Sequence, residues 1–195
     1  MGRPSVKEER REQILMAYET CVARFGVEGA SLEKVAEEAG LARPLIRHNI
    51  GNREDLLAAL VERFLDRSDR SVRVMIDALP TPGSIHILID WLFDSEYSNA
   101  QFVLVAEALI AASQNDPALA TLMRNWTRDF VSTVRSVIEL AYPATRADQL
   151  DAVAAGVTGI YFNTDSLAPL GEMPDMREAS KRAAKMLVSH LGSVE

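Results

Sequence analysis

The 195-residue sequence is 48% hydrophobic and 25% charged, with 10 glycines and 8 prolines, which is typical of a globular chain that buries a sizeable core. Its single cysteine, Cys21, excludes an internal disulfide framework and a multi-cysteine zinc site, and we expect no cofactor. No stretch approaches the roughly 18 consecutive apolar residues of a membrane span, and the charged N-terminal stretch is unlike a signal peptide. We therefore predict a cytoplasmic protein without a membrane partner.

The net charge of −7 is unevenly distributed along the chain. Residues 1–73 contain 13 basic and 13 acidic residues, so the totals of 21 and 28 leave 8 and 15 for residues 74–195. Within the first part, residues 39–53 contain three arginines and a histidine but no carboxylate. This stretch is a local basic face in an acidic protein, which makes a phosphate-bearing partner compatible with the total charge.

Two helices are predicted in the first 40 residues. Apolar residues recur at helical spacing from Ile14 to Phe25, and Gly26 is a natural C-terminal stop. Ser31 can cap a second, short helix, which ends at Gly40 because glycine tolerates a left-handed turn.

A third helix follows at once and turns Ile46 and Ile50, one turn apart, toward the core. Asn52 then caps a fourth helix, and Asp55 favours its first turn. An apolar stripe carries this fourth helix to about Leu79.

The remaining chain is also predicted to be helical. Residues 80–83, Pro-Thr-Pro-Gly, interrupt the pattern because proline and glycine do not continue a helix. Later helix starts are indicated at Ser98 with Gln101, at Asp116-Pro117, at Thr145 and at Asp175. Since no alternating β-branched run is present, we predict an all-α protein of about nine helices. We expect residues 1–52 to form the first domain and residues 53–195 to form the second domain. The fourth helix, residues 53–79, connects the first domain to the rest of the second.

Two short helices joined across Gly40 and braced by longer helices predict a helix-turn-helix, whose second helix enters the DNA major groove. If Ile46 and Ile50 face the core, their neighbours on the third helix face outward. There Arg47 can bind guanine or a phosphate, Leu45 a thymine methyl, and Arg53 a backbone phosphate. The alternative is a solvated basic face on a helical bundle. The residues that we expect to contact double-stranded DNA are Ser31, Arg43, Pro44, Leu45, Arg47, His48 and Arg53.

Residues 10–65 resemble the N-terminal domain of the TetR (tetracycline-repressor-like) family. The caps, the glycines, the apolar positions and the basic residue before Glu54-Asp55-Leu56 fall in register from Gly26 through ASLEKVAEEAGLARPLIRHNIGNREDLLAAL. The resemblance implies a three-helix DNA-binding domain followed by a helical domain for ligand binding and dimerisation. It also implies a homodimeric repressor that binds an inverted-repeat operator and is released by a small-molecule effector.

The third helix departs from the family pattern. Ala42 stands where the family commonly has a capping serine or threonine, and residues 47–50, Arg-His-Asn-Ile, replace an aromatic-rich run of which only His48 matches. The family's contact geometry therefore does not transfer directly. Arg3 and Lys7 precede the first helix, where the family can use an arm toward DNA; a frayed charged terminus is the alternative.

The predicted dimer interface includes Ala155, Gly156 and Gly159. Each glycine costs up to about 1 kcal/mol inside a helix unless a close approach requires it. Tight packing across a dimer explains these glycines, and packing within one subunit is the rival explanation.

Large aromatic residues are frequent after Ser84, and the middle helices of this family usually enclose a pocket. The alternative for each aromatic side chain is a place in the core, which is the more usual position of such residues. The effector-lining residues that we predict are Trp91, Phe102, Trp126, Phe130 and Tyr161.

An enzyme is not indicated, because the chain has no phosphate-binding glycine loop, no G-x-S-x-G turn and no H-E-x-x-H motif. We also expect no metal site, since the three histidines lack ligand spacing. The predicted function is a ligand-released DNA-binding repressor. The alternative is a dimeric helical adaptor or ligand-binding protein that has lost DNA binding.

Overall fold

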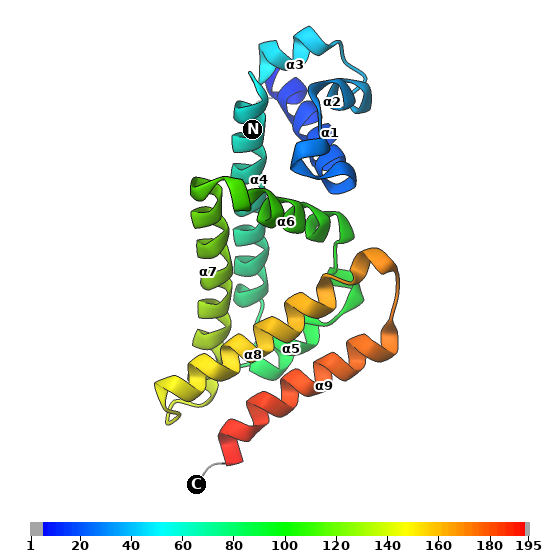
Figure 1. Ribbon diagram of the computed structural model, residues 1–195. Coiled ribbons are helices and arrows are strands. Elements are labelled where there is room, and N and C mark those ends of the chain that lie inside the picture. Colours follow the sequence, from blue (N-terminus) through cyan, green and yellow to red (C-terminus); the bar gives the residue numbers. More distant parts are fainter. Residues whose placement is uncertain (1–5, 194–195) are drawn as a thin grey trace. The chain divides into compact units, whose positions relative to one another are not determined.

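The computed structural model describes residues 6–193, which form nine α-helices, four 3-10 turns and no strand (Figure 1). The predicted all-α class is therefore confirmed. None of these helices is long and apolar enough to traverse a lipid bilayer. The α-helices are α1 (Val6–Gly29), α2 (Leu32–Glu38), α3 (Arg43–Asn49), α4 (Arg53–Asp77), α5 (Ile85–Leu92), α6 (Ala100–Ala112), α7 (Pro117–Ala141), α8 (Ala147–Asp165) and α9 (Pro174–His190). The 3-10 turns are η1 (Ser95–Tyr97), η2 (Ser113–Asn115), η3 (Ala168–Leu170) and η4 (Leu191–Ser193).

The chain divides into two compact units. Among the described residues, unit 1 comprises 6–68 and 104–121, and unit 2 comprises 69–103 and 122–193. The helix α4 is continuous from unit 1 into unit 2, since its residues fall on both sides of position 68.

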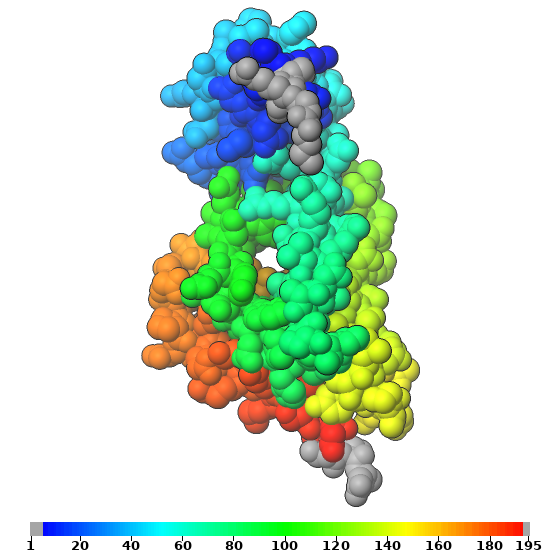
Figure 2. Space-filling view, turned by 180° about the vertical axis from the view of Figure 1, so that it is seen from behind, coloured from blue at the N-terminus to red at the C-terminus, as the bar shows by residue number. Residues whose placement is uncertain are grey.

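In unit 1, α1, α2, α3 and the first half of α4 share an apolar core, and their atoms form one compact lobe (blue to cyan in Figures 1 and 2). Burial of the apolar side chains in this core is the main force that holds the four helical segments together. The largest fully buried side chains of the lobe are Ile14, Tyr18, Val22, Val35, Ile46, Leu56 and Leu60.

Two glycines bend the backbone of this lobe. Gly40 has a φ of 62°, so the predicted left-handed turn between α2 and α3 is confirmed. Gly26 has a φ of 69° and a ψ of 171°, which is not helical, so the regular part of the first helix stops there as predicted; a short turn then continues α1 to Gly29. That extra turn brings the end of α1 within reach of Arg53 at the start of α4.

The predicted caps of α2, α4 and α7 are confirmed. The Ser31 hydroxyl accepts from Lys34 N at 3.3 Å, and Asn52 Oδ1 accepts from Asp55 N at 3.0 Å. The Asp55 carboxylate in turn accepts from Asn52 N at 2.9 Å, which completes a capping box. Asp116 Oδ1 accepts from Leu119 N at 3.0 Å.

The other predicted helix starts were wrong by one or two residues. Asn99, not Ser98, caps α6, because its Oδ1 accepts from Phe102 N at 2.9 Å. The residue before α8 is Arg146 rather than Thr145, and α9 starts at Pro174, so Asp175 lies in its first turn. These stretches contain several adjacent capping types, and spacing alone does not choose among them.

In unit 2, α5, α7, α8 and α9 surround a second core, with α8 and α9 side by side (Figure 1). Its innermost side chains, each with no exposed surface, are Ile89, Ile138, Ala154, Val157, Ala184 and Val188. Lys185 Nζ donates to Asp90 Oδ1 at 2.6 Å and so links α9 to α5 at the rim of this core.

Candidate nucleic-acid interface

The helix α3 is anchored by one side chain and exposed along most of its length. Ile46 has no exposed surface, and Ile50 is half-buried, as the sequence predicted. The remaining α3 side chains that the sequence assigned to DNA, namely Arg43, Pro44, Leu45, Arg47 and His48, are all exposed. A buried isoleucine thus fixes which face of α3 remains available to a partner.

Arg47 and His48 are the least constrained basic side chains of α3. Neither forms an ion pair or side-chain hydrogen bond with any residue in the range 6–193. Leu45 beside them is 39% exposed, so its apolar side chain is also available to a partner. A cation next to an exposed apolar side chain matches the two kinds of contact that the major groove offers.

Arg43 begins α3 and is paired within the protein. Its Nη1 donates to Glu33 Oε1 on α2 at 2.6 Å, with about half of the arginine side chain exposed. Exposed ion pairs of this kind contribute at most about 1 kcal/mol, so a phosphate could replace the carboxylate. To bind DNA, Arg43 would therefore have to give up an ion pair within the protein, whereas Arg47 would not.

Arg53 begins α4 and caps the end of α1. Its Nη2 donates to Val27 O at 2.9 Å, to Glu28 O at 3.1 Å and to the Glu28 carboxylate at 2.9 Å. The helix-end carbonyls would otherwise lack protein partners. The guanidinium of Arg53, which was predicted to bind a phosphate, thus also holds the start of α4 against the last turn of α1.

The N-terminal ends of α2 and α3 differ. Ser31 is exposed and its hydroxyl caps α2, whereas Ala42 provides no side-chain cap for α3, as its sequence implied. Such an absent cap costs about 1 kcal/mol of local stability. Pro44, in the first turn of α3, offsets part of that cost through its fixed φ. Of the proposed N-terminal arm, Lys7 is exposed on α1, and Arg3 lies outside the described residues.

Sequence reasoning missed the ionic network that joins α1 to α4 within unit 1. Glu19 is buried, and it accepts from Arg63 Nε at 3.1 Å and from Arg67 Nη1 at 3.0 Å. Arg63 Nη1 also donates to Glu12 at 2.7 Å. The available signal was a carboxylate inside the apolar stripe of α1, between Tyr18 and Val22. This network fixes the first half of α4 to the helix that supports α2 and α3.

The aromatic residues predicted to line an effector pocket are half-buried in unit 2. Trp126 and Phe130 on α7 and Tyr161 on α8 lie in one cluster with Phe162, which was not among the predicted residues. Adjacent ring centroids are 5.3 to 5.6 Å apart in the stacked pairs. Trp91 on α5 and Phe102 on α6 are half-buried as well. The clustered rings pack on one another, and stacking of this kind also stabilises a core.

The three residues assigned to a dimer interface lie on α8 and are unequally exposed. A Cβ at Gly156 would lie 3.0 Å from Leu187 Cδ1 of α9, so packing within the chain explains that glycine. A Cβ at Gly159 would have no atom within 4 Å, and both Gly159 and Ala155 are exposed. Contacts within unit 2 therefore give no reason for a glycine at position 159.

An exposed helix that follows a glycine turn and is held by a buried isoleucine defines a helix-turn-helix. No family model matches the sequence. Among curated proteins, HTH-type transcriptional regulators named BetI are similar. The one from Stenotrophomonas maltophilia is 29% identical over 126 residues, or 64% of each chain. The one from Burkholderia cenocepacia is 26% identical over 186 residues, or 94% of each chain.

Solved structures share the fold over almost the whole chain. A TetR transcription regulator from Haloarcula marismortui has a TM-score of 0.74 at 16% identity, covering 93% of this chain and 97% of that one. A putative transcriptional regulator from Pseudomonas aeruginosa has a TM-score of 0.76 at 21% identity, covering 95% and 91%. The resemblance to the TetR family that the sequence predicted is confirmed. The chain therefore resembles TetR-family proteins in fold and resembles HTH-type transcriptional regulators in sequence.

Proposed function

We propose that this protein is a DNA-binding transcriptional regulator that acts as a homodimer on an inverted-repeat operator and releases it when a small-molecule effector binds. The observation that carries the proposal is the α3 face, where Arg47, His48 and Leu45 are exposed around a buried Ile46. The names of the curated relatives support the same class. The alternative, an adaptor without DNA binding, rests only on the unusual sequence of residues 47–50.

The helix α4 is the element that we expect to transmit effector binding. One end of α4 holds Arg53 and is tied to α1 through Glu19, and the other end belongs to unit 2. A tilt of α4 would therefore move α1 and the α3 that it supports. Trp91, Phe102, Trp126, Phe130 and Tyr161 remain the proposed effector-contacting residues. Coupling energies of about 1–3 kcal/mol are typical of such switches.

Selection of bound DNA from a random pool tests the function directly. The protein is expected to enrich an inverted repeat whose half-site centres are about 34 Å apart, because a two-fold dimer presents its reading helices one helical turn apart. Affinity for the enriched sequence should fall steeply with salt despite the acidic net charge, since phosphate contacts release counterions. A pool that shows no enrichment after repeated rounds would favour the adaptor.

Dimerisation is proposed to use the outer face of α8 and α9. This face presents Ala155 and Gly159 from α8 and Met186 from α9, whose side chain is 72% exposed. We expect Ala155→Arg to convert the dimer to a monomer in sedimentation velocity, because two arginines would meet across the two-fold axis without a partner. The folded subunit should be retained, since Ala155 is exposed on the subunit surface.

Ala118→Arg is the matched control, because Ala118 is also an exposed helical alanine but lies on α7. This variant should sediment like the unmodified protein. The α8–α9 interface would be abandoned if Ala155→Arg remained a dimer, or if the unmodified protein sedimented as a monomer at micromolar concentration.

A further inference from the structure

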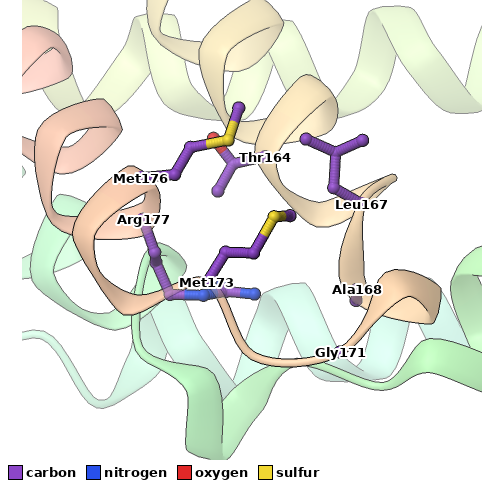
Figure 3. A pocket seen from close by; sticks show the side chains of 7 residues that line it. All are labelled: Thr164, Leu167, Ala168, Gly171, Met173, Met176 and Arg177. Carbon is purple, nitrogen blue, oxygen red and sulfur yellow. The ribbon is translucent and has the colours of Figure 1, made fainter.

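A small hollow lies in unit 2 where the chain turns from α8 into α9 (Figure 3). Its lining includes Thr164 on α8, Met173 just before α9 and Arg177 on α9. The hollow has room for little more than one water molecule, which is too little for an organic ligand. The charged side chains of unit 1, by contrast, form a regular pattern around α3.

Three of the four arginines in residues 24–53 form ion pairs with glutamates of the same stretch. The pairs are Arg24–Glu38 at 3.5 Å, Arg43–Glu33 at 2.6 Å and Arg53–Glu28 at 2.9 Å. The fourth arginine, Arg47, has no such partner within residues 6–193. The charge of this stretch is therefore largely neutralised inside the protein, except on α3 at Arg47.

The Arg43–Glu33 pair is the one whose loss would add a cation to α3. A single guanidinium nitrogen donates to a single carboxylate oxygen, and more than half of each side chain is exposed. Arg53 differs, because Val27 O and Glu28 O also accept from its Nη2 and would still hold it without the Glu28 carboxylate. Removal of Glu33 thus releases Arg43, whereas removal of Glu28 leaves Arg53 in place.

A phosphate that approaches Arg43 also approaches Glu33. The carboxylate lies 2.6 Å from the guanidinium, well within the roughly 10 Å over which charges interact at 0.1 M salt. It competes with the phosphate for the same donor and also repels it. Binding to DNA of arbitrary sequence depends on phosphate contacts alone, whereas binding to an operator also uses base contacts. Glu33 should therefore weaken the first kind of binding more than the second.

We propose that Glu33 is a specificity-determining residue, an inference that rests on the proposed DNA-binding function. By holding Arg43 in an internal pair, Glu33 weakens binding to DNA of arbitrary sequence and leaves recognition to Arg47 and Leu45. A genome offers a large excess of competing sites, so the ratio of operator affinity to random-sequence affinity decides how often the operator is occupied. Glu33 acts on this ratio through Arg43, without a DNA contact of its own.

Fluorescence anisotropy with a duplex of random sequence tests the proposal on the full-length protein. Glu33→Gln is expected to bind this duplex about tenfold more tightly, because one more cation in each subunit becomes available to a phosphate. The slope of log K against log salt should steepen by about one for each subunit. Affinity for the enriched operator should rise less, so the ratio of the two affinities falls. Arg43→Gln added to Glu33→Gln should abolish the gain.

Glu37→Gln is the matched control, since Glu37 is an exposed glutamate one turn further along α2 and no arginine within residues 6–193 pairs with it. This variant removes the same charge and should change the affinity for random DNA by less than about twofold. Equal gains in the two variants would overturn the proposal, because they would show a general effect of net charge. Unchanged affinity in Glu33→Gln would also overturn it, and so would a gain that persists without Arg43.

Elution from immobilised heparin separates this proposal from the proposed function. Heparin is a sulfated polyanion without bases, so it reports whether Arg43 is available to an anion even if no operator exists. Glu33→Gln should elute at a higher salt concentration than the unmodified protein and Glu37→Gln, and thermal melts verify that each variant is folded. An unmodified protein that binds no duplex would contradict the proposed function. Equal elution of Glu33→Gln and Glu37→Gln would contradict the role of Glu33.

Discussion

Replacing Arg47 with alanine is expected to weaken operator binding more than any other single substitution on α3. Arg47 is exposed, and it need not break an ion pair within residues 6–193 before it binds DNA. Removal of an arginine that binds a base costs about 1–3 kcal/mol, and both half-sites of a dimer are affected. Each half-site then contributes a roughly 5- to 150-fold decrease in affinity. Fluorescence anisotropy with the enriched operator measures the change.

The salt dependence of the same titration separates two roles for Arg47. If Arg47 binds a phosphate, the slope of log K against log salt should become shallower by about one for each phosphate that the variant no longer binds, and all sequences should be affected alike. If Arg47 reads a base, the variant should instead tolerate a changed base pair at that position. Either outcome is consistent with a place on the reading surface.

Arg128→Ala is the control for Arg47, because Arg128 is an exposed arginine of unit 2 and its removal changes the net charge equally. Its affinity for the operator should match that of the unmodified protein. Arg43→Ala should cost less than Arg47→Ala, since Arg43 gives up its ion pair with Glu33 when it binds DNA. Unchanged affinity in Arg47→Ala would remove this residue from the reading surface.

The parts of the fold that could be predicted depend on interactions between neighbours in the sequence. The Ser31 and Asn52 caps span two or three residues, and Ile46 follows from helical periodicity. The left-handed turn at Gly40 needs only the residue type. These features are local, so a single sequence specifies them.

The charge pattern of the site could not be predicted in the same way. Residues 39–53 contain no carboxylate, yet folding places Glu33 on Arg43 and Glu28 on Arg53, across separations of 10 and 25 residues. Many glutamates along the chain could have supplied those partners, and spacing does not identify which one does. The hydrogen bonds of Arg53 to the end of α1 also required the extra turn after Gly26, which the periodicity did not predict.

The same long-range geometry makes Glu19 the position where a stability effect should be largest among the charged residues of unit 1. Glu19 joins α1 to Arg63 and Arg67 of α4, and its side chain is only 10% exposed. Removing one partner of a buried ion pair usually costs about 3–5 kcal/mol. Because Arg67 is 40% exposed and regains water, we expect Glu19→Ala to lower the free energy of unfolding by about 2 kcal/mol.

Urea denaturation followed by circular dichroism measures this change, and Glu12→Ala is the matched control. Glu12 lies on the same helix and binds the same Arg63, but half of its side chain is exposed, so its removal should cost less than about 1 kcal/mol. Equal destabilisation of the two variants would show that burial of Glu19 contributes nothing to the free energy of unfolding.

The same pair of variants tests whether Glu19 transmits a movement of α4 to α1. If Glu19 joins these two helices rigidly, its replacement should uncouple their movements. Effector binding would then release the operator less completely in Glu19→Ala than in Glu12→Ala, because a tilt of α4 would no longer move the helix that supports α3.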